Sequence, residues 1–223
     1  MSYVRRFFPL YFLLLSPVYG QPHRMQFSIH VNPGLSWFSS DVREVKSTGS
    51  LMGWGYGIAM DAFFSENYAL TTGIGIESLG GNLQYKDSTA FSISNNKTIM
   101  LPPNTSVQYT IQYLTVPLGI KMKSIEIGYI TYYAQAGINT HFTILARGTS
   151  NDAIPLLDKD NVSREINYFN LGYHIGGGIE YSIGGHNALL FGILYNHGFS
   201  DITKSTTDHI LYHYVTAKIG FLF

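Results

Sequence analysis

The sequence has no cysteine among its 223 residues and few charged ones. Without cysteine there is no disulfide framework, no zinc–thiolate site and no cysteine for lipid attachment. Charged residues make up 13% of the chain, whereas a typical soluble domain has about 25%. Lys and Arg together number 14, as do Asp and Glu. No net positive field attracts nucleic acid, so no nucleic-acid partner is predicted.

Long hydrophobic runs are also missing after the N-terminal segment. A membrane-spanning helix needs about 20 consecutive apolar residues, and no stretch of the remaining chain approaches that length. Aromatic residues, in contrast, are abundant at 15% of the chain, with 17 Tyr and 14 Phe. Few charges and many aromatics are typical of a protein whose outer surface is not mainly in water. If this chain enters a membrane, it does so with strands.

The first 20 residues have the three parts of a secretory signal peptide. Arg5 and Arg6 form the positive part, an apolar core runs over 7–18, and the small residue Gly20 precedes the expected cleavage site. The apolar core is short for a membrane span and contains two prolines. We therefore predict an exported protein with a signal peptide at residues 1–20 and one domain at residues 21–223.

The rest of the chain alternates between apolar and polar residues with a period of two, which predicts half-buried strands. Eight such runs are present, at 25–38, 53–64, 68–78, 109–122, 130–142, 167–183, 188–199 and 211–223. The connections between them are alternately long and short. Long connections at one end and short turns at the other predict an antiparallel up-and-down transmembrane β-barrel with eight strands and both termini at the short-turn end.

The charges within these runs indicate which way the barrel faces. All of them lie on the face that carries Gly, Ser, Thr and Asn, and none lies on the apolar face. A lysine facing lipid near the bilayer midplane costs about 2 to 4 kcal/mol, whereas a charge in the lumen can pair or be hydrated. We therefore predict an apolar outside and a charged network inside the barrel, formed by Asp61, Glu77, Lys121, Glu180 and Lys218.

The length of the runs and the aromatic residues at their ends fit a membrane span. A tilted barrel strand needs about 9 to 11 residues to cross, which each run supplies. Aromatic residues near the strand ends predict two interfacial girdles, formed by Trp37, Trp54, Phe64, Tyr68, Tyr109, Phe142, Phe199, Phe221 and Phe223.

The glycine-rich stretch GYHIGGGIEYSIGGHN, residues 172–187, raises the question of phosphate binding. It lacks the spacing of a dinucleotide-binding or P-loop motif and opens no helix. Its alternation instead places Gly172, Gly176 and Gly178 toward a narrow lumen, where they act as spacers, and Gly184 and Gly185 in a tight turn. No cofactor is predicted.

The histidines and carboxylates leave two chemical alternatives open. His209 and His213 lie four residues apart, which on a strand is roughly 13 Å, too far to share a metal ion. The inward histidines His30, His141 and His174 can converge across the lumen, although hydrogen-bonded histidines are the simpler interpretation. No esterase elbow or zincin motif is present. An enzyme assembled from separate strands remains an alternative, but the sequence predicts no catalytic and no metal-binding residue.

The long connections at 80–108 and 143–166 are polar with scattered Ile, Leu, Met and Phe. Long loops on a rigid scaffold often carry function, but they also vary freely at a surface. The inside of an eight-stranded barrel is narrow enough for side chains to fill, so a wide pore is not expected.

Several short motifs resemble one known family. YLTVPLGIKMK, YHIGGGIEYSI, LYNHGFSDI and the final strand ending in IGFLF are similar to PorT-type outer-membrane β-barrels of Bacteroidetes, over essentially the whole mature chain. The terminal Phe223 also resembles the aromatic residue that such proteins present to the barrel-assembly machinery. The resemblance implies insertion in the outer membrane of a Gram-negative bacterium, contact with its lipid and, for some members, a part in protein secretion.

The predicted function is therefore a non-enzymatic scaffold or interaction protein of the outer membrane. Its partners include the barrel-assembly machinery during insertion and, as a secretion component, other envelope or secretion-complex proteins. The alternatives are a narrow channel for small solutes, a loop-based binder or adhesin, and an outer-membrane enzyme.

Overall fold

The computed structural model describes residues 24–93, 97–150, 157–204 and 209–223. The predicted signal peptide at 1–20 lies outside the described residues. Twelve strands are present in this part of the chain: β1 (Met25–Val31), β2 (Gly34–Ser40), β3 (Val45–Ser65), β4 (Tyr68–Tyr85), β5 (Thr89–Ile93), β6 (Lys97–Leu101), β7 (Thr105–Lys123), β8 (Ile130–Ser150), β9 (Asp160–Asn161), β10 (Phe169–Gly184), β11 (Asn187–Gly198) and β12 (Ile210–Leu222). Within the described ranges, no helix is long and apolar enough to cross a membrane.

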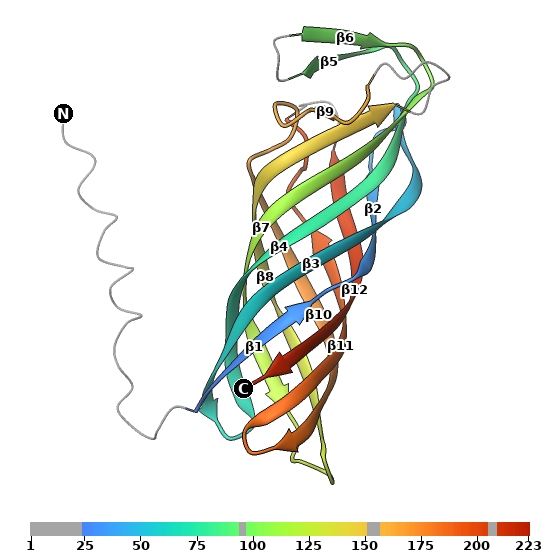
Figure 1. Cartoon of the computed structure of the whole chain (residues 1–223). Helices are drawn as coiled ribbons and strands as arrows, with labels where there is room; N and C mark the ends of the chain where they lie inside the picture. The colour runs from blue at the N-terminus through green and yellow to red at the C-terminus, as the bar shows by residue number, and fades with distance from the viewer. Residues whose placement is uncertain (1–23, 94–96, 151–156, 205–208) are drawn as a thin grey trace, which may run out of the picture.

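The strands form a closed ring of antiparallel neighbours (Figure 1). Going around the ring, β3, β4, β7, β8, β10, β11 and β12 follow one another, and β1 and β2 together fill the gap between β12 and β3. β1 and β2 keep one continuous register and count as a single barrel strand. The predicted eight-stranded up-and-down transmembrane barrel is therefore confirmed, with both ends of the described chain at the short-turn end.

The break between β1 and β2 has a simple cause. Pro33 has no backbone N–H and cannot donate to the sheet. The neighbouring Asn32 still exchanges two backbone hydrogen bonds with Gly55, at 2.8 and 3.0 Å. The carbonyl of Pro33 accepts a hydrogen bond from the backbone N–H of Ala217 at 2.9 Å. The wall of the barrel thus stays closed across the proline.

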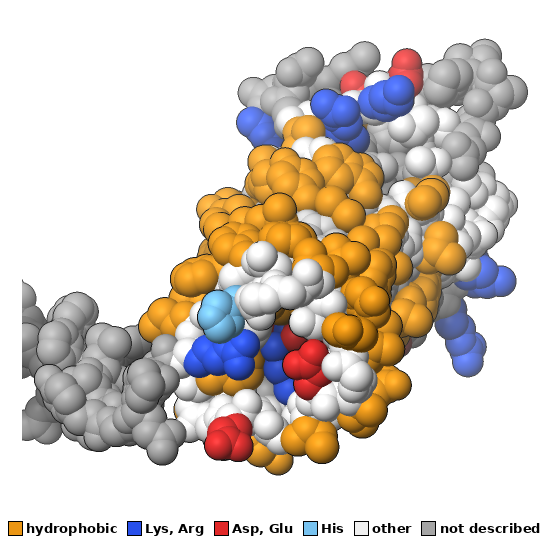
Figure 2. Space-filling model, turned by 60° about the horizontal axis from the view of Figure 1, so that its bottom comes forward, with side chains coloured by type: hydrophobic (Ala, Val, Ile, Leu, Met, Phe, Trp, Pro, Cys, Tyr) orange, Lys and Arg blue, Asp and Glu red, His pale blue; other side chains and the backbone are white. Residues whose placement is uncertain are grey.

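Hydrophobic side chains cover the visible wall of the barrel near the short turns, and charged side chains of both signs gather in its mouth (Figure 2). Exposed large hydrophobic side chains come from every strand of the ring, so they form a band around this part of the barrel. The outward residues of this band are exposed, as illustrated by Ile58, Ile120 and Ile175, with 57%, 50% and 56% of their surface accessible. Because such a belt is unfavourable in water, it identifies the portion of the wall that lies in lipid.

Four strands continue well beyond this band, which corrects one prediction. The regions 39–52, 80–108 and 143–166 were expected to be loops, but β3, β4, β7 and β8 extend into them and are 18 to 21 residues long. The two-stranded hairpin of β5 and β6 lies at the long-loop end, and the short β9 pairs with β8. The loops are therefore shorter than the connections predicted from the sequence.

The polarity of the wall inverts where the strands leave the band, as β7 illustrates. Its outward residues Leu118 and Ile120 are apolar, whereas Gln108 and Gln112, on the same face toward the long-loop end, are polar. On the inner face the order is reversed, with polar or charged side chains in the band and apolar ones beyond it. The two ends of one strand thus match two different solvents.

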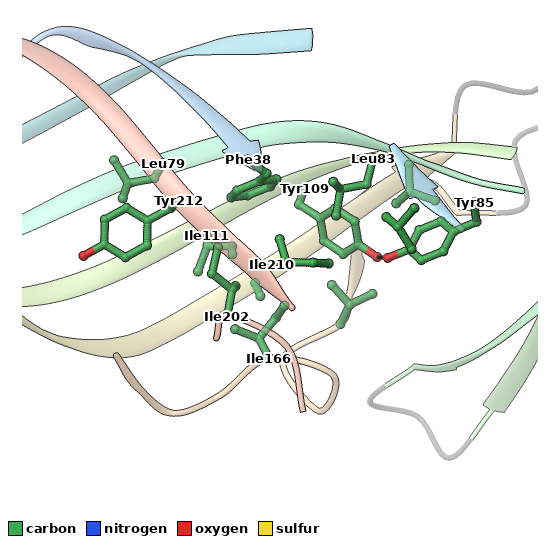
Figure 3. Close-up of a cluster of buried hydrophobic side chains, with 14 of the residues drawn as sticks. Phe38, Leu79, Leu83, Tyr85, Tyr109, Ile111, Ile166, Ile202, Ile210 and Tyr212 are labelled. Carbon is green, nitrogen blue, oxygen red and sulfur yellow. Dashed lines mark hydrogen bonds between the residues drawn. The ribbon is translucent and has the colours of Figure 1, made fainter. Parts of the chain in front are cut away.

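The inner face beyond the band forms an apolar core at the long-loop end (Figure 3). Its members come from the extended strands and from the segments folded over them: Phe38, Val45, Leu79, Leu83, Tyr85, Leu101, Val107, Tyr109, Ile111, Tyr113, Ala146, Leu157, Val162, Ile166, Ile202, Ile210, Tyr212 and Tyr214. We call this set the outer core. Tyr109 was predicted to belong to an interfacial girdle, but it points inward, and its hydroxyl lies 2.7 Å from that of Tyr85.

Candidate functional site

The inside of the barrel is filled by layers of side chains, and the layer nearest the short turns is ionic. Lys121 lies between two carboxylates, with Nζ 2.6 Å from Asp61 Oδ2 and 2.7 Å from Glu180 Oε1. Lys123 Nζ lies 2.5 Å from the other oxygen of Glu180 and 2.7 Å from Gln26 Oε1. β3, β7 and β10 supply these charges, so the layer ties together strands that are not all neighbours.

Lys123 was missed by the sequence reasoning, which assigned it to a turn. It lies two residues after Lys121 on the same face of β7, so extending the alternation by one step would have found it. With Lys123 included, the interior holds three lysines against the three carboxylates of Asp61, Glu77 and Glu180. Formal charges inside the barrel therefore cancel.

The middle layer consists of polar side chains around a small cavity. Asn139 donates to Asn196 Oδ1 at 2.9 Å, and its own Oδ1 lies 2.8 Å from His174 Nδ1. Lys218 is buried here at 8% exposure and makes none of the ion pairs found among the described residues. The cavity that these side chains line measures about 50 Å³, which is room for one or two water molecules.

Glu77 forms a third layer, below the outer core. Its Oε2 accepts a hydrogen bond from the hydroxyl of Tyr214 at 2.5 Å and one from Thr115 at 3.0 Å. The Nδ1 atom of His141 lies 3.9 Å from the same oxygen and 2.8 Å from the hydroxyl of Thr115. Glu77 is thus held by neutral donors rather than by a lysine.

The structure places all five predicted network residues inside the barrel but brings only three into contact. Asp61, Lys121 and Glu180 form the ionic layer, while Glu77 and Lys218 lie outside it and both line the small cavity. The alternation specifies the face of each residue but not its height along the barrel, which depends on the register between strands.

The inward histidines do not gather at one point. The Nδ1 atoms of His30, His141 and His174 each lie beside a different polar side chain, at 3.1, 2.8 and 2.8 Å. In the described part of the chain, no group of three His, Cys, Asp or Glu residues is placed to hold a metal ion.

Gly172, Gly176 and Gly178 of β10 lie on the inner face of the wall, where it is crowded. Gly178 faces Gly192 on β11, and a Cβ atom at Gly178 would collide with the backbone of Phe191 and Gly192. Gly184 and Gly185, with φ of 114° and 65°, form the turn to β11, a conformation that favours glycine. These glycines shape the wall and the turn, as a spacing role requires.

Comparison with known proteins agrees with this architecture. A family described as outer membrane protein beta-barrel domain matches residues 18–204 of the chain. The chain therefore belongs to this family, which locates it in the outer membrane of a Gram-negative bacterium. A search of curated proteins finds no match.

Several solved outer-membrane barrels are similar in structure but distant in sequence. Neisserial surface protein A (NspA) is 13% identical, with 91% of this chain and 98% of that one covered and a TM-score of 0.45. OprG from Pseudomonas aeruginosa is 13% identical, with coverages of 90% and 95% and a TM-score of 0.42. The outer membrane protease OmpT from Escherichia coli is 7% identical, with coverages of 92% and 99% and a TM-score of 0.46. Identities this low carry no information about what this chain does.

Proposed function

We propose that this protein is a non-enzymatic interaction protein of the outer membrane, in which a closed barrel anchors a rigid extension outside the membrane that docks another macromolecule. The observation that carries the proposal is the outer core, which fills the barrel where β3, β4, β7 and β8 leave the membrane. A filled barrel has no path to offer a solute. What it presents to its surroundings is the outer face of these strands and the segments above them.

The contents of the lumen argue against the alternative of a narrow channel. A solute would have to pass the ionic layer, where Lys121 is only 3% exposed, and then an apolar core with fully buried side chains such as Leu83 and Ile111. Moving these side chains aside would break buried ion pairs and uncover apolar surface at the same time. The cavity found between the two layers measures about 50 Å³.

The same filling argues against the alternative of an enzyme. One group of interior side chains, formed by Glu77, His141 and Thr115, resembles a general acid–base arrangement. His141 has no exposed surface and lies directly under Tyr113 and Tyr212 of the outer core, with ring centroids 5.3 Å apart in both pairs. No substrate reaches this group from either end without unpacking the barrel.

The extension beyond the membrane is suited to docking because its backbone is already ordered. β7 pairs with both β4 and β8 up to their outer ends, from Tyr85↔Thr105 to Val107↔Ser150. A partner that binds a preordered strand surface avoids the entropic cost of ordering a loop. The resemblance to PorT-type barrels supports a more specific form of the proposal, in which the partner is a component of a protein-secretion complex of a bacteroidete envelope and the chain is exported by its signal peptide.

The proposal is tested by photocrosslinking in native outer membranes. A photoreactive amino acid is placed at Gln108 or Arg147, on the outer face of the extension, and at Glu126 in a short turn as a matched control. We expect one defined adduct from the first two positions and none of that size from Glu126. Replacing residues 89–98 with two glycines, which removes most of the self-paired β5–β6 hairpin, tests whether the hairpin contributes to the adduct.

A second measurement addresses the channel alternative. Purified protein is inserted in planar bilayers and conductance is recorded with KCl. We expect no steps above the background of protein-free bilayers. Reproducible conductance, or an extension that forms no adduct in native membranes, would contradict the proposed function.

A further inference from the structure

Two histidines face each other on the outer surface of the barrel, where the strands leave the lipid band. His197 near the end of β11 and His213 near the start of β12 are register partners, and both side chains point outward. Their Nδ1 atoms lie 3.0 Å apart, and their ring centroids lie 4.5 Å apart. No step of the proposed function uses this pair.

His213 is fixed in one orientation by its neighbours. Trp37 on β2 is its register partner on the other side and stacks on the imidazole with an interplanar angle of 3°. The Nε2 atom of His213 lies 2.9 Å from the hydroxyl of Ser39. When Nε2–H donates to that hydroxyl, Nδ1 is unprotonated and its lone pair points toward His197. Such a hydrogen bond on the distal nitrogen is what orients metal-binding histidines in proteins.

The separation of the two Nδ1 atoms matches a shared metal ion. With metal–nitrogen bonds of about 2.0 to 2.1 Å, two nitrogens at cis positions of a tetragonal site are about 2.9 Å apart, and at tetrahedral positions about 3.3 Å. The observed 3.0 Å is closer to the tetragonal value. The hydroxyl oxygen of Tyr195 lies 2.9 Å from His213 Nδ1 and is therefore a further oxygen ligand beside this nitrogen. In His197 a shift of the proton from Nδ1 to Nε2 frees the second lone pair without changing the charge.

The position of the pair leaves it open to ions from outside the cell. His197 and His213 are half-buried and lie on the outer face of two neighbouring strands, β11 and β12. Tyr173 and Trp37 flank the pair in the same row across four strands. Aromatic residues of this kind mark the membrane–water interface, where water and dissolved ions reach the site.

We propose that His197 and His213 form a binding site for a divalent transition-metal ion of the copper(II) type, completed by water and the oxygen of Tyr195. Imidazole nitrogens suit this class of ion, a tetragonal arrangement of nitrogen and oxygen ligands is typical of copper(II), and copper(II) binds most tightly among the divalent first-row metals. The absence of cysteine removes any competing thiolate from the chain. The site does not depend on the proposed docking function.

The test measures copper(II) alone against the full mature protein, produced without a histidine tag and folded in detergent micelles. All variants carry His23→Ala, which removes a histidine near the N-terminus outside the described residues. Titration calorimetry in the presence of glycine as a weak competitor gives the affinity and stoichiometry. Electron paramagnetic resonance reports the number of coordinating nitrogens. We expect one equivalent of copper(II) with two imidazole nitrogens.

The variants identify the ligands. His197→Gln and His213→Gln are each expected to weaken binding at least tenfold and to remove the two-nitrogen signature, and Ser39→Ala to weaken it severalfold. His209→Gln is the matched control, since His209 is 73% exposed and lies only four residues before His213. Heat-dependent mobility in gels verifies that each variant folds. The proposal is overturned if the His23→Ala protein with no further change shows no such equivalent, or if His209→Gln weakens binding as much as the other two.

Discussion

Lys121 is expected to be the most sensitive single position of the ionic layer. Asp61 is only 4% exposed and loses its ion-pair partner in Lys121→Met. Glu180 is also paired with Lys123, at 2.5 Å, and keeps that partner. Removing one partner of a buried ion pair typically costs 3 to 5 kcal/mol, since a charge is left without compensation. We expect the free energy of unfolding to fall by about 3 to 5 kcal/mol, because the carboxylate of Asp61 is left unpaired while that of Glu180 keeps a partner.

The measurement is reversible unfolding by urea in phospholipid bilayers, followed by the fluorescence of Trp37 and Trp54, the two tryptophans of the chain. Lys46→Met, at an exposed position of β3 outside the membrane, is the control and should change stability by less than about 0.5 kcal/mol. The double variant Asp61→Asn/Lys121→Met should recover part of the loss, because it removes the stranded charge as well. The reasoning fails if Lys121→Met costs no more than Lys46→Met, or if the double variant is less stable than Lys121→Met alone.

Three further predictions concern the wall and the outer core. Ile120→Lys, which faces lipid, should cost about 2 to 4 kcal/mol in the same unfolding assay, while Gln112→Lys on the same face of β7 should be nearly neutral; equal effects would contradict the inversion of polarity. Leu83→Ala should lower the free energy of unfolding by about 2 to 5 kcal/mol, because it leaves a cavity in the outer core, whereas the neighbouring Gln84→Ala should change it little. The idea is refuted if neither substitution changes the stability. Gly178→Val should prevent assembly, seen as loss of heat-dependent gel mobility, because a side chain collides with β11; a normally folded variant would show that the glycine is dispensable.

The barrel itself was predictable because lipid and lumen impose opposite demands on alternate residues of every strand. In β12, for example, Val215 and Ile219 face out while Lys218 faces in, and the period of two is enough to see this. The charges gave the direction, since a lysine on the lipid face is costly. Strand number and the placement of the termini followed from the connections.

The extended ends of the strands were not predictable in the same way. The segment from Val107 to Tyr113 alternates as regularly as the membrane part of β7, but with the apolar residues on the opposite face. Reading a single polarity along the chain assigned residues 105–108 to a loop and placed Tyr109 in an outer girdle, although the run at 109–122 was predicted as a strand. Where a strand passes from lipid into water, the period of two continues, but the apolar residues move from the outer to the inner face.

The contacts between strands were also beyond the sequence. His213 was compared with His209, its neighbour along the chain, whereas its partner in the fold is His197 on the adjacent strand. The ionic layer shows the same limit, since the register of β3, β7 and β10 decides that Lys121 meets Asp61 and Glu180 but not Glu77. Alternation shows which face of the wall a residue occupies, and strand pairing shows its height along the barrel.

The inversion of polarity along β7 also fixes the depth at which the protein sits. Sliding the barrel outward by one pair of residues would lift Leu114 into water, and sliding it inward would draw Gln112 into hydrocarbon. Both displacements are unfavourable, so the barrel stays at one depth in the bilayer. The extension therefore projects from the cell surface by a constant distance, set by the sequence of the strands rather than by any attachment to the lipid.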